Sequence, residues 1–160
     1  MTPGWCPSRT LSRAGWGMLG GVPGAQFETL TGDDCRRLLA GESVGRLGVV
    51  RGGFPLIIPV NYACHHDRIV VHTDLGTKFS AARQNRVSFE VDRIDASKRT
   101  GWSVLVQGFG VEVVRGDDAQ YEEIAAVAVE PWAPGDRNRI LLITPISVTG
   151  RRISRTSSHR

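Results

Sequence analysis

The sequence GRLGVVRGGFPLIIPVNYACHHDRIVVHT, residues 45–73, contains three apolar, β-branched runs that short breaks separate. Gly52 and Gly53 separate the first two runs, and glycine readily adopts the positive φ angles of a two-residue hairpin turn. The polar CHHD segment, residues 64–67, separates the second run from the third. These residues therefore predict three consecutive strands joined by tight turns.

Three further strands are predicted toward the C-terminus. Apolar residues alternate with polar ones over residues 86–94, a longer run covers residues 102–114, and the final strand covers residues 138–153. The run at 102–114 is expected to bend at Gly108 or Gly110, as a sheet that closes on itself requires. Because the connections are too short for parallel crossovers, we predict a mainly β fold with six antiparallel strands in a closed or partly closed barrel.

Three short helices are predicted between the strands. Thr31 can cap a helix that ends at Gly41, and the first turn of this helix contains two aspartates. The sequence TKFSAARQ, residues 77–84, predicts a second helix, and a third is expected to begin at Asp117 or Asp118. We expect these helices to flank the barrel.

The positive charge of the chain lies at its two ends. The 160 residues carry a formal charge of +4, but residues 1–25 and 151–160 hold six arginines and no acid, which leaves the central part with a charge of −2. A nucleic-acid partner is therefore not expected, because a phosphate backbone is bound by a basic surface. No membrane partner is expected, since no apolar run reaches the roughly 20 residues of a membrane helix.

Composition divides the chain into three parts. Residues 1–25 lack the continuous apolar run of a secretory signal, and we expect them to form a disordered N-terminal extension. Residues 26–153 form the predicted domain, and residues 154–160 a flexible basic tail. The three cysteines, without C-x-x-C spacing, argue against a disulfide framework or a structural zinc site. A cytoplasmic location is the simplest interpretation.

Pro59 interrupts the second predicted strand. Proline lacks a backbone donor, so it belongs on a sheet edge or where a neighbouring strand is absent. Either it only prevents edge-to-edge association, or the gap admits a planar ligand whose polar edge bonds to the backbone of Val60 and Asn61 and to the Asn61 amide. Tyr62 fits either such a site or the core.

The segment HTDLGTK, residues 72–78, contains the groups that a bound phosphate requires. Helix-start N–H groups and the hydroxyl of Thr77 would converge on one dianion with the Lys78 ammonium, after the flexible Gly76. A helix cap followed by an exposed lysine explains the same residues without a ligand. His72, on the preceding strand, is either a ligand contact or a structural histidine.

The adjacent histidines His65 and His66 raise the question of a metal site. Neighbouring side chains in a turn are expected to point in different directions, and no second Cys/His pair follows at ligand spacing. No metal site is therefore predicted.

Two tryptophans are candidates for ligand contacts. Trp102 and Ser103 begin a long predicted strand, where a tryptophan is more often a packing anchor. Trp132 lies between two prolines and either covers a substrate or fills a loop.

Five segments in succession carry a resemblance to a known family. They are GRLGVV (45–50), PVNYACHHDRIVVHTDLGTKFSAARQNRVSFEVD (59–92), GWSVLVQG (101–108), PWAPG (131–135) and ITPISVTGRRI (143–153). This order resembles the pyridoxamine 5′-phosphate oxidase-like family of FMN-binding split barrels, over about residues 27–153. Within that family the chain is most similar to the branch that includes nitroimidazole reductases.

The resemblance implies a six-stranded antiparallel split β-barrel that binds FMN and forms a homodimer with the cofactor sites at the interface. The matching Pro-Val-Asn-Tyr segment lies against the flavin in that family, the matches of Thr73, Thr77 and Lys78 bind the phosphate, and the matches of Trp102 and Ser103 approach the flavin, often from the partner subunit. With His72 added, the candidate cofactor-binding residues are Pro59, Val60, Asn61, Tyr62, His72, Thr73, Thr77, Lys78, Trp102 and Ser103.

The function that follows is that of an FMN-dependent oxidoreductase acting on a small molecule through the flavin. No catalytic side chain is assigned, because no Ser/His/Asp or Cys/His set is evident. A non-catalytic flavin- or haem-binding protein and a deazaflavin-dependent reductase remain alternatives. Pyridoxamine phosphate oxidation itself is disfavoured, because the C-terminal GRRISRTSSHR, residues 150–160, lacks the Arg-Leu-x-Pro-type end that the family uses for that substrate.

Overall fold

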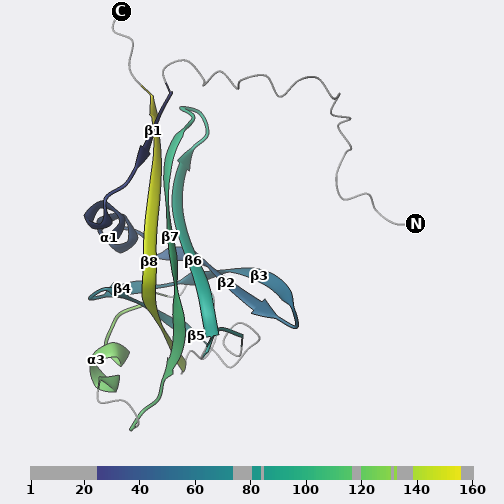
Figure 1. Ribbon diagram of the computed structural model, residues 1–160. Coiled ribbons are helices and arrows are strands. Elements are labelled where there is room, and N and C mark those ends of the chain that lie inside the picture. The colour runs from purple at the N-terminus through teal and green to yellow at the C-terminus, as the bar shows by residue number, and fades with distance from the viewer. Residues whose placement is uncertain are drawn as a thin grey trace, which may run out of the picture.

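The computed structural model describes residues 25–73, 81–83, 85–116, 120–130, 132 and 139–155. One antiparallel sheet dominates this part of the chain (Figure 1). Its strands are β1 (Ala25–Thr29), β2 (Val44–Arg51), β3 (Phe54–Asn61), β4 (Ala63–His65), β5 (Arg68–Thr73), β6 (Asn85–Asp95), β7 (Thr100–Val113) and β8 (Arg139–Arg155). The helices α1 (Gly32–Ala40) and α3 (Tyr121–Ala125) lie beside the sheet.

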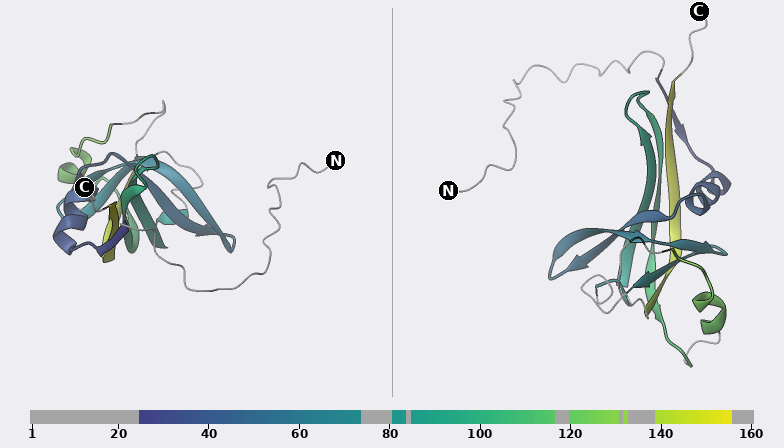
Figure 2. Two further views of the ribbon diagram at one scale, coloured as in Figure 1. Left: turned by 90° about the horizontal axis from the view of Figure 1, so that it is seen from above. Right: turned by 180° about the vertical axis from the view of Figure 1, so that it is seen from behind.

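The sheet curls because its two edge strands, β3 and β4, follow one another directly in sequence and must therefore lie close together. The strand order is β3-β2-β6-β7-β8-β5-β4, with β1 added to β8. The long strands β6, β7 and β8 run together, and β2, β3 and β4 cross them at a steep angle (Figure 1). Seen from above, the strands form a curled layer from which the β2–β3 hairpin projects (Figure 2). The predicted mainly β, antiparallel split barrel is confirmed.

The number of strands is corrected from six to eight among the described residues. The single run predicted from Phe54 to Ala63 is divided into β3 and β4 because it changes partner, from β2 to β5. β1 was not predicted, since its five residues are all exposed and show no alternation. Only its pairing with β8, from Ala25 opposite Arg155 to Thr29 opposite Arg151, holds it extended.

A predicted turn and a predicted bend are confirmed by the backbone. Gly52 and Gly53 have φ angles of 56° and 81° and join β2 to β3. The register between β7 and β8 shifts between Gln107 and Gly108, which is the expected bend. A Cβ atom at Gly108 would collide with the carbonyl oxygen of Thr144, so only glycine permits this close approach of the strands.

The helices agree only in part with their predictions. Thr31 caps α1 as expected, because its Oγ1 accepts a hydrogen bond of 3.2 Å from the Asp34 N–H, and the helix ends before Gly41. α3 begins later than predicted, after Gln120, which makes no side-chain cap. Residues 117–119 and most of the helix predicted over residues 77–84 lie outside the described part of the chain.

The two faces of the sheet bury different cores. The face that we call inner packs the main core, in which the largest fully buried side chains include Phe89, Leu47, Leu141 and Ile143, together with residues of α1. The opposite, outer face carries a smaller cluster beneath α3: Val70, Val113, Ile124, Ile140 and Leu142. Each strand therefore contributes alternate residues to the two faces.

β8 extends two residues beyond the predicted end of the domain. Ser154 and Arg155, which the sequence assigned to the flexible tail, belong to β8 and pair with β1. Residues 1–24 and 156–160, where most of the predicted extension and tail lie, are outside the described residues. In the part that the structure describes, none of the helices has the length and apolar character needed to cross a bilayer.

Candidate functional site

The candidate site begins where β5 stops pairing with β4, at a break in strand pairing that we call the opening between β3 and β5. The β4–β5 ladder pairs Ala63 with Val70 and ends there. Continuing that register by two residues would place Asn61 level with His72, but β3 is paired instead with β2, where Asn61 is opposite Val44 and Pro59 is opposite Arg46. Pro59 therefore lies on the edge strand of the sheet, as predicted, where its missing N–H costs no ladder bond to β5.

Asn61 connects this opening to the loop that follows α3. The backbone N–H of Trp132 donates a hydrogen bond of 3.1 Å to Oδ1 of Asn61, across 71 residues of sequence. Trp132 is 74% exposed, so its indole is not part of the core. The Asn61 side chain thus holds the backbone of an exposed tryptophan at the edge of β3, and its amide nitrogen is still able to donate hydrogen bonds.

His72 is the predicted site residue with the most distinctive environment. It pairs with Ile140 on β8 and shares the outer face of β5 with Val70. Its Nε2 is buried and has no hydrogen-bond partner among the described residues. Burial lowers the pKa of His72, which favours a neutral imidazole. A buried ring nitrogen without a partner costs free energy, so His72 is a candidate for a ligand contact.

The next two predicted residues, Val60 and Tyr62, point to the inner face. Val60 is buried in the main core, so only its backbone is available at the edge. The Tyr62 hydroxyl donates a 2.5 Å hydrogen bond to the carbonyl oxygen of Leu39, and its ring packs edge-on against Phe89 at 4.9 Å between centroids. Burial raises the pKa of Tyr62. Of the two predicted roles for Tyr62, the structure selects the core.

The predicted phosphate residues are only partly described. Thr73 ends β5 and is 5% exposed. Among the described residues, it is the one buried residue of the polar and charged types that does not belong to the hydrophobic core. It shares the inner side of β5 with Ile69 and Val71. Thr77 and Lys78 lie outside the described residues, so the phosphate site formed by them stays a prediction.

Trp102 and Ser103 are not brought to this opening within one chain. Trp102 pairs with Arg152 of β8, whereas His72 pairs with Ile140, which is twelve residues away along the same strand. At about 3.3 Å per residue this separation is roughly 40 Å along β8. Trp102 packs against the main core, as an anchor does. A contribution of these residues to a site on a neighbouring chain stays a prediction.

A broad groove on the outer face lies between the β2–β3 hairpin and β8. Its volume is about 670 Å³, and its lining includes Val50, Ile57, Arg86, Gln107 and Ile146. Val50, Ile57 and Ile146 are between 63% and 76% exposed. Three large apolar side chains are thus exposed beside one groove.

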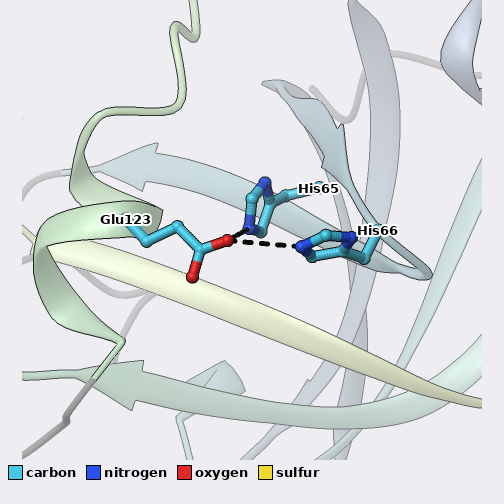
Figure 3. A group of neighbouring side chains, drawn as sticks. All are labelled: His65, His66 and Glu123. Carbon is cyan, nitrogen blue, oxygen red and sulfur yellow. Dashed lines mark hydrogen bonds and ion pairs between the residues drawn. The ribbon is translucent and has the colours of Figure 1, made fainter.

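One cluster contradicts an argument made from the sequence. His65 and His66 do not point in different directions, because their Nε2 atoms lie 3.0 and 3.3 Å from the same Oε1 of Glu123 (Figure 3). His66 leaves the extended conformation with a φ of 52°, which turns its ring toward that of His65. Hydrogen bonds from His66 and then His65 lower the pKa of Glu123. In the sequence, only the adjacent histidines pointed to this cluster, because Glu123 lies 57 residues after His66.

Comparison with known proteins relates most of the described residues to one family. Residues 31–152 match the family described as pyridoxamine 5′-phosphate oxidase. The uncharacterized protein Rv0080 of Mycobacterium tuberculosis is 34% identical over 128 residues, which are 76% of this chain and 82% of that protein.

Solved structures support the same assignment. An FAD-binding protein from Mycobacterium smegmatis is 26% identical, with a TM-score of 0.60 over 79% of this chain and 98% of that one. An FAD-binding protein from Mesorhizobium loti is 25% identical, with a TM-score of 0.63 over 82% and 99% of the two chains. A Bacteroides thetaiotaomicron protein named for 5-nitroimidazole antibiotic resistance is 14% identical, with a TM-score of 0.60 over 81% and 89% of the two chains, and so shares the fold alone. The chain belongs to the pyridoxamine 5′-phosphate oxidase family of split barrels.

Proposed function

We propose that this protein binds a flavin nucleotide at the opening between β3 and β5 and acts as a flavin-dependent oxidoreductase on a small molecule. The observation that carries the proposal is the buried Nε2 of His72, which has no hydrogen-bond partner among the described residues and lies on β5, two residues beyond the end of its pairing with β4. The polar edge of an isoalloxazine ring offers both donors and acceptors to such groups. The M. smegmatis and M. loti relatives, both named as FAD-binding, support the same class of ligand.

The residues at the opening fit a planar, partly apolar ligand. Pro59 and Asn61 present the edge of β3, and Trp132 stands exposed beside them. An aromatic face next to an unpaired strand edge suits a flat ring system that also needs polar contacts along one side. When bound, the flavin would supply the electron-transfer chemistry, while these residues would orient its ring and limit the access of water.

We propose FMN as the cofactor, with FAD as the competing candidate. Both molecules contain riboflavin 5′-phosphate, so a phosphate site at Thr73, Thr77 and Lys78 would serve either. The names of the relatives favour FAD, and the resemblance of the GTK segment favours FMN. The same names attribute binding and no reaction, so a flavin-binding protein without turnover is the second candidate function.

We further propose a homodimer with the cofactor sites at its interface. The β2–β3 hairpin projects from the rest of the sheet (Figure 2). Its side chains Val50, Phe54 and Ile57 are exposed. These side chains, together with the groove on the outer face, form an apolar surface that a second copy of the chain would bury. In such a dimer, Trp102 and Ser103 of the partner subunit would approach the flavin.

For the cell we propose a cytoplasmic location and neither a nucleic-acid nor a membrane partner. The two cysteines among the described residues, Cys35 and Cys64, are both free thiols. Burial raises the pKa of Cys64 to about 11, so its thiol stays protonated and unreactive near neutral pH.

The test of the function is the identity of the small molecule that copurifies with the full chain. We expect a yellow protein with a flavin spectrum, a mass that identifies FMN or FAD, and bleaching by a reduced nicotinamide. A Soret band would identify haem instead, and a flavin spectrum without bleaching or turnover would favour the non-catalytic alternative. A chain that binds neither FMN nor FAD when these are added would refute the proposal.

The phosphate site is tested with the two lysines of the chain. Lys78→Ala should weaken FMN binding roughly 10- to 150-fold, because a charge-assisted contact is worth on the order of 1.5 to 3 kcal/mol, and should hardly affect riboflavin, which has no phosphate. Lys98 is the matched control, since its ammonium lies 3.3 Å from Asp95 in the β6–β7 turn. Equal losses for FMN and riboflavin would contradict the assignment of Lys78.

A further inference from the structure

The cluster of His65, His66 and Glu123 joins two parts of the fold that are distant in sequence. His65 ends β4, His66 lies in the β4–β5 turn, and Glu123 lies on α3 (Figure 3). A second contact supports the same junction, because Nη2 of Arg68 donates a 2.8 Å hydrogen bond to Oε1 of Gln120, the residue before α3. The turn and the helix are therefore held in a defined relation next to the cluster.

The three side chains have the ligand atoms and the spacing of a transition-metal site. The Nε2 atoms of His65 and His66 lie 3.0 and 3.3 Å from Oε1 of Glu123, and the three ligand atoms are all within 4.8 Å of one another. Ligands bound to zinc at about 2.1 Å in a tetrahedron are roughly 3.4 Å apart. The two histidine–carboxylate pairs are thus within a few tenths of an ångström of that spacing, and the two histidine nitrogens are no more than 4.8 Å apart.

The β4–β5 turn places the two histidines side by side. His66 and Asp67 form the two-residue turn between His65 and Arg68, which pair with each other, and His66 has the positive φ of 52° that such a turn requires. The two rings lie 4.3 Å apart between their centroids, with both Nε2 atoms toward Glu123. The hairpin turn therefore presents two imidazoles to one carboxylate.

We propose that His65, His66 and Glu123 bind one divalent transition-metal ion of the zinc class. Two imidazoles and one carboxylate form the ligand set that zinc, cobalt and nickel accept, whereas magnesium and calcium prefer oxygen ligands throughout. Three protein ligands leave a fourth position for water or another small ligand. The Glu123 side chain is 55% exposed and that of His66 69% exposed, so an ion can reach the cluster from solvent.

A bound ion would fix α3 to the barrel. α3 has five residues, too few to be stable as an isolated helix, and it is held by Ile124 in the small core on the outer face. A metal bridge from the turn to Glu123 would add a second attachment on its exposed side. The chain that follows α3 reaches Trp132, which contacts Asn61, so the ion would also restrict one wall of the opening between β3 and β5. This inference does not depend on flavin binding.

The test is a titration of the chelator-treated, tag-free full chain with Co²⁺ and Zn²⁺. We expect one ion per chain by calorimetry and the visible absorption of cobalt with nitrogen and oxygen ligands. His65→Gln, His66→Gln and Glu123→Gln should each weaken binding at least tenfold, since loss even of an outer-shell partner costs roughly 10- to 100-fold. Two matched controls should bind as the unmodified chain does: Glu122→Gln, whose carboxylate faces Arg115, and His159→Gln in the C-terminal segment.

A second measurement needs no variant and so does not depend on the folding of mutants. In NMR spectra of the unmodified chain, Zn²⁺ should shift the ring signals of His65 and His66 and leave those of His72 in place. Absence of binding to the unmodified chain, equal weakening by Glu122→Gln, or a Zn²⁺ response centred on His72 or His159 would overturn the proposal.

Discussion

The inner and outer faces of strands β6 and β7 present the same kinds of side chain to very different surroundings. On the inner face Phe89 and Val106 are fully buried, whereas on the outer face of β7 Leu105 and Phe109 are 39% and 41% exposed. The edge strand is divided in the same way, since Val60 is buried in the core and Ile57 is 76% exposed. Inner residues of these strands therefore serve the stability of the chain, and the outer apolar residues that lie outside the cluster beneath α3 are available for binding and assembly.

The largest effect should come from Phe89, the most buried aromatic side chain of the described residues. Phe89→Ala should reduce the free energy of unfolding by roughly 3 to 5 kcal/mol, because it leaves a cavity in the main core. The matched variant on the outer face, Phe109→Ala, should cost clearly less, as its ring is partly in water. Urea denaturation followed by circular dichroism measures both, and equal losses would break the distinction between the faces.

Tyr62 tests whether an inner residue of the candidate site acts on stability or on binding. Tyr62→Phe removes the hydroxyl that donates to the Leu39 carbonyl oxygen and should cost about 1 to 3 kcal/mol of stability, with flavin affinity unchanged. Tyr121→Phe, the same change on the half-buried face of α3, serves as control. Loss of flavin binding at unchanged stability would instead place the Tyr62 hydroxyl in the site.

The outer face is tested by a variant in the groove. Ile57→Ser should weaken the proposed homodimer at least tenfold, about 1.4 kcal/mol, because truncation of a large apolar side chain at an interface removes buried area. Ile94→Ser is the control, since Ile94 is 69% exposed but does not line the groove. Analytical ultracentrifugation over a range of concentrations gives both dissociation constants, and similar shifts for the two variants would remove the groove from the interface.

The smallest effect concerns the pH dependence of stability through His72. Burial lowers the pKa of His72 in the folded chain, so below the ordinary histidine value of about 6.5 the unfolded chain binds more protons than the folded one. Stability should then fall as the pH is lowered through this range, and His72→Asn should flatten that fall. Urea midpoints at pH 7.5 and 5.5 measure it, and an unchanged slope in the variant would show that the imidazole is not the group responsible.

The candidate site illustrates how far prediction from sequence reached. Pro59 and Asn61 are placed on an open strand edge as predicted, because the missing donor of proline excludes it from a central strand in any fold. The choice between core and site for Tyr62 could not be made, since it depends on which face of the strand meets α1. The contact of Asn61 with Trp132 was not predicted either, because no local pattern relates residues so far apart.

By itself, the sequence determined what depends on neighbours along the chain: the strands with alternating residues, the Gly52–Gly53 turn, the bend at Gly108 and the capping of α1 by Thr31. Backbone dihedral preferences and side-chain alternation act over a few residues, so a pattern can be recognised without a fold. Only the tertiary structure decided which strand each edge pairs with, which face is covered, and that Glu123 meets both His65 and His66. Those contacts depend on how the sheet curls, and that is set by the packing of the whole chain rather than by any one segment.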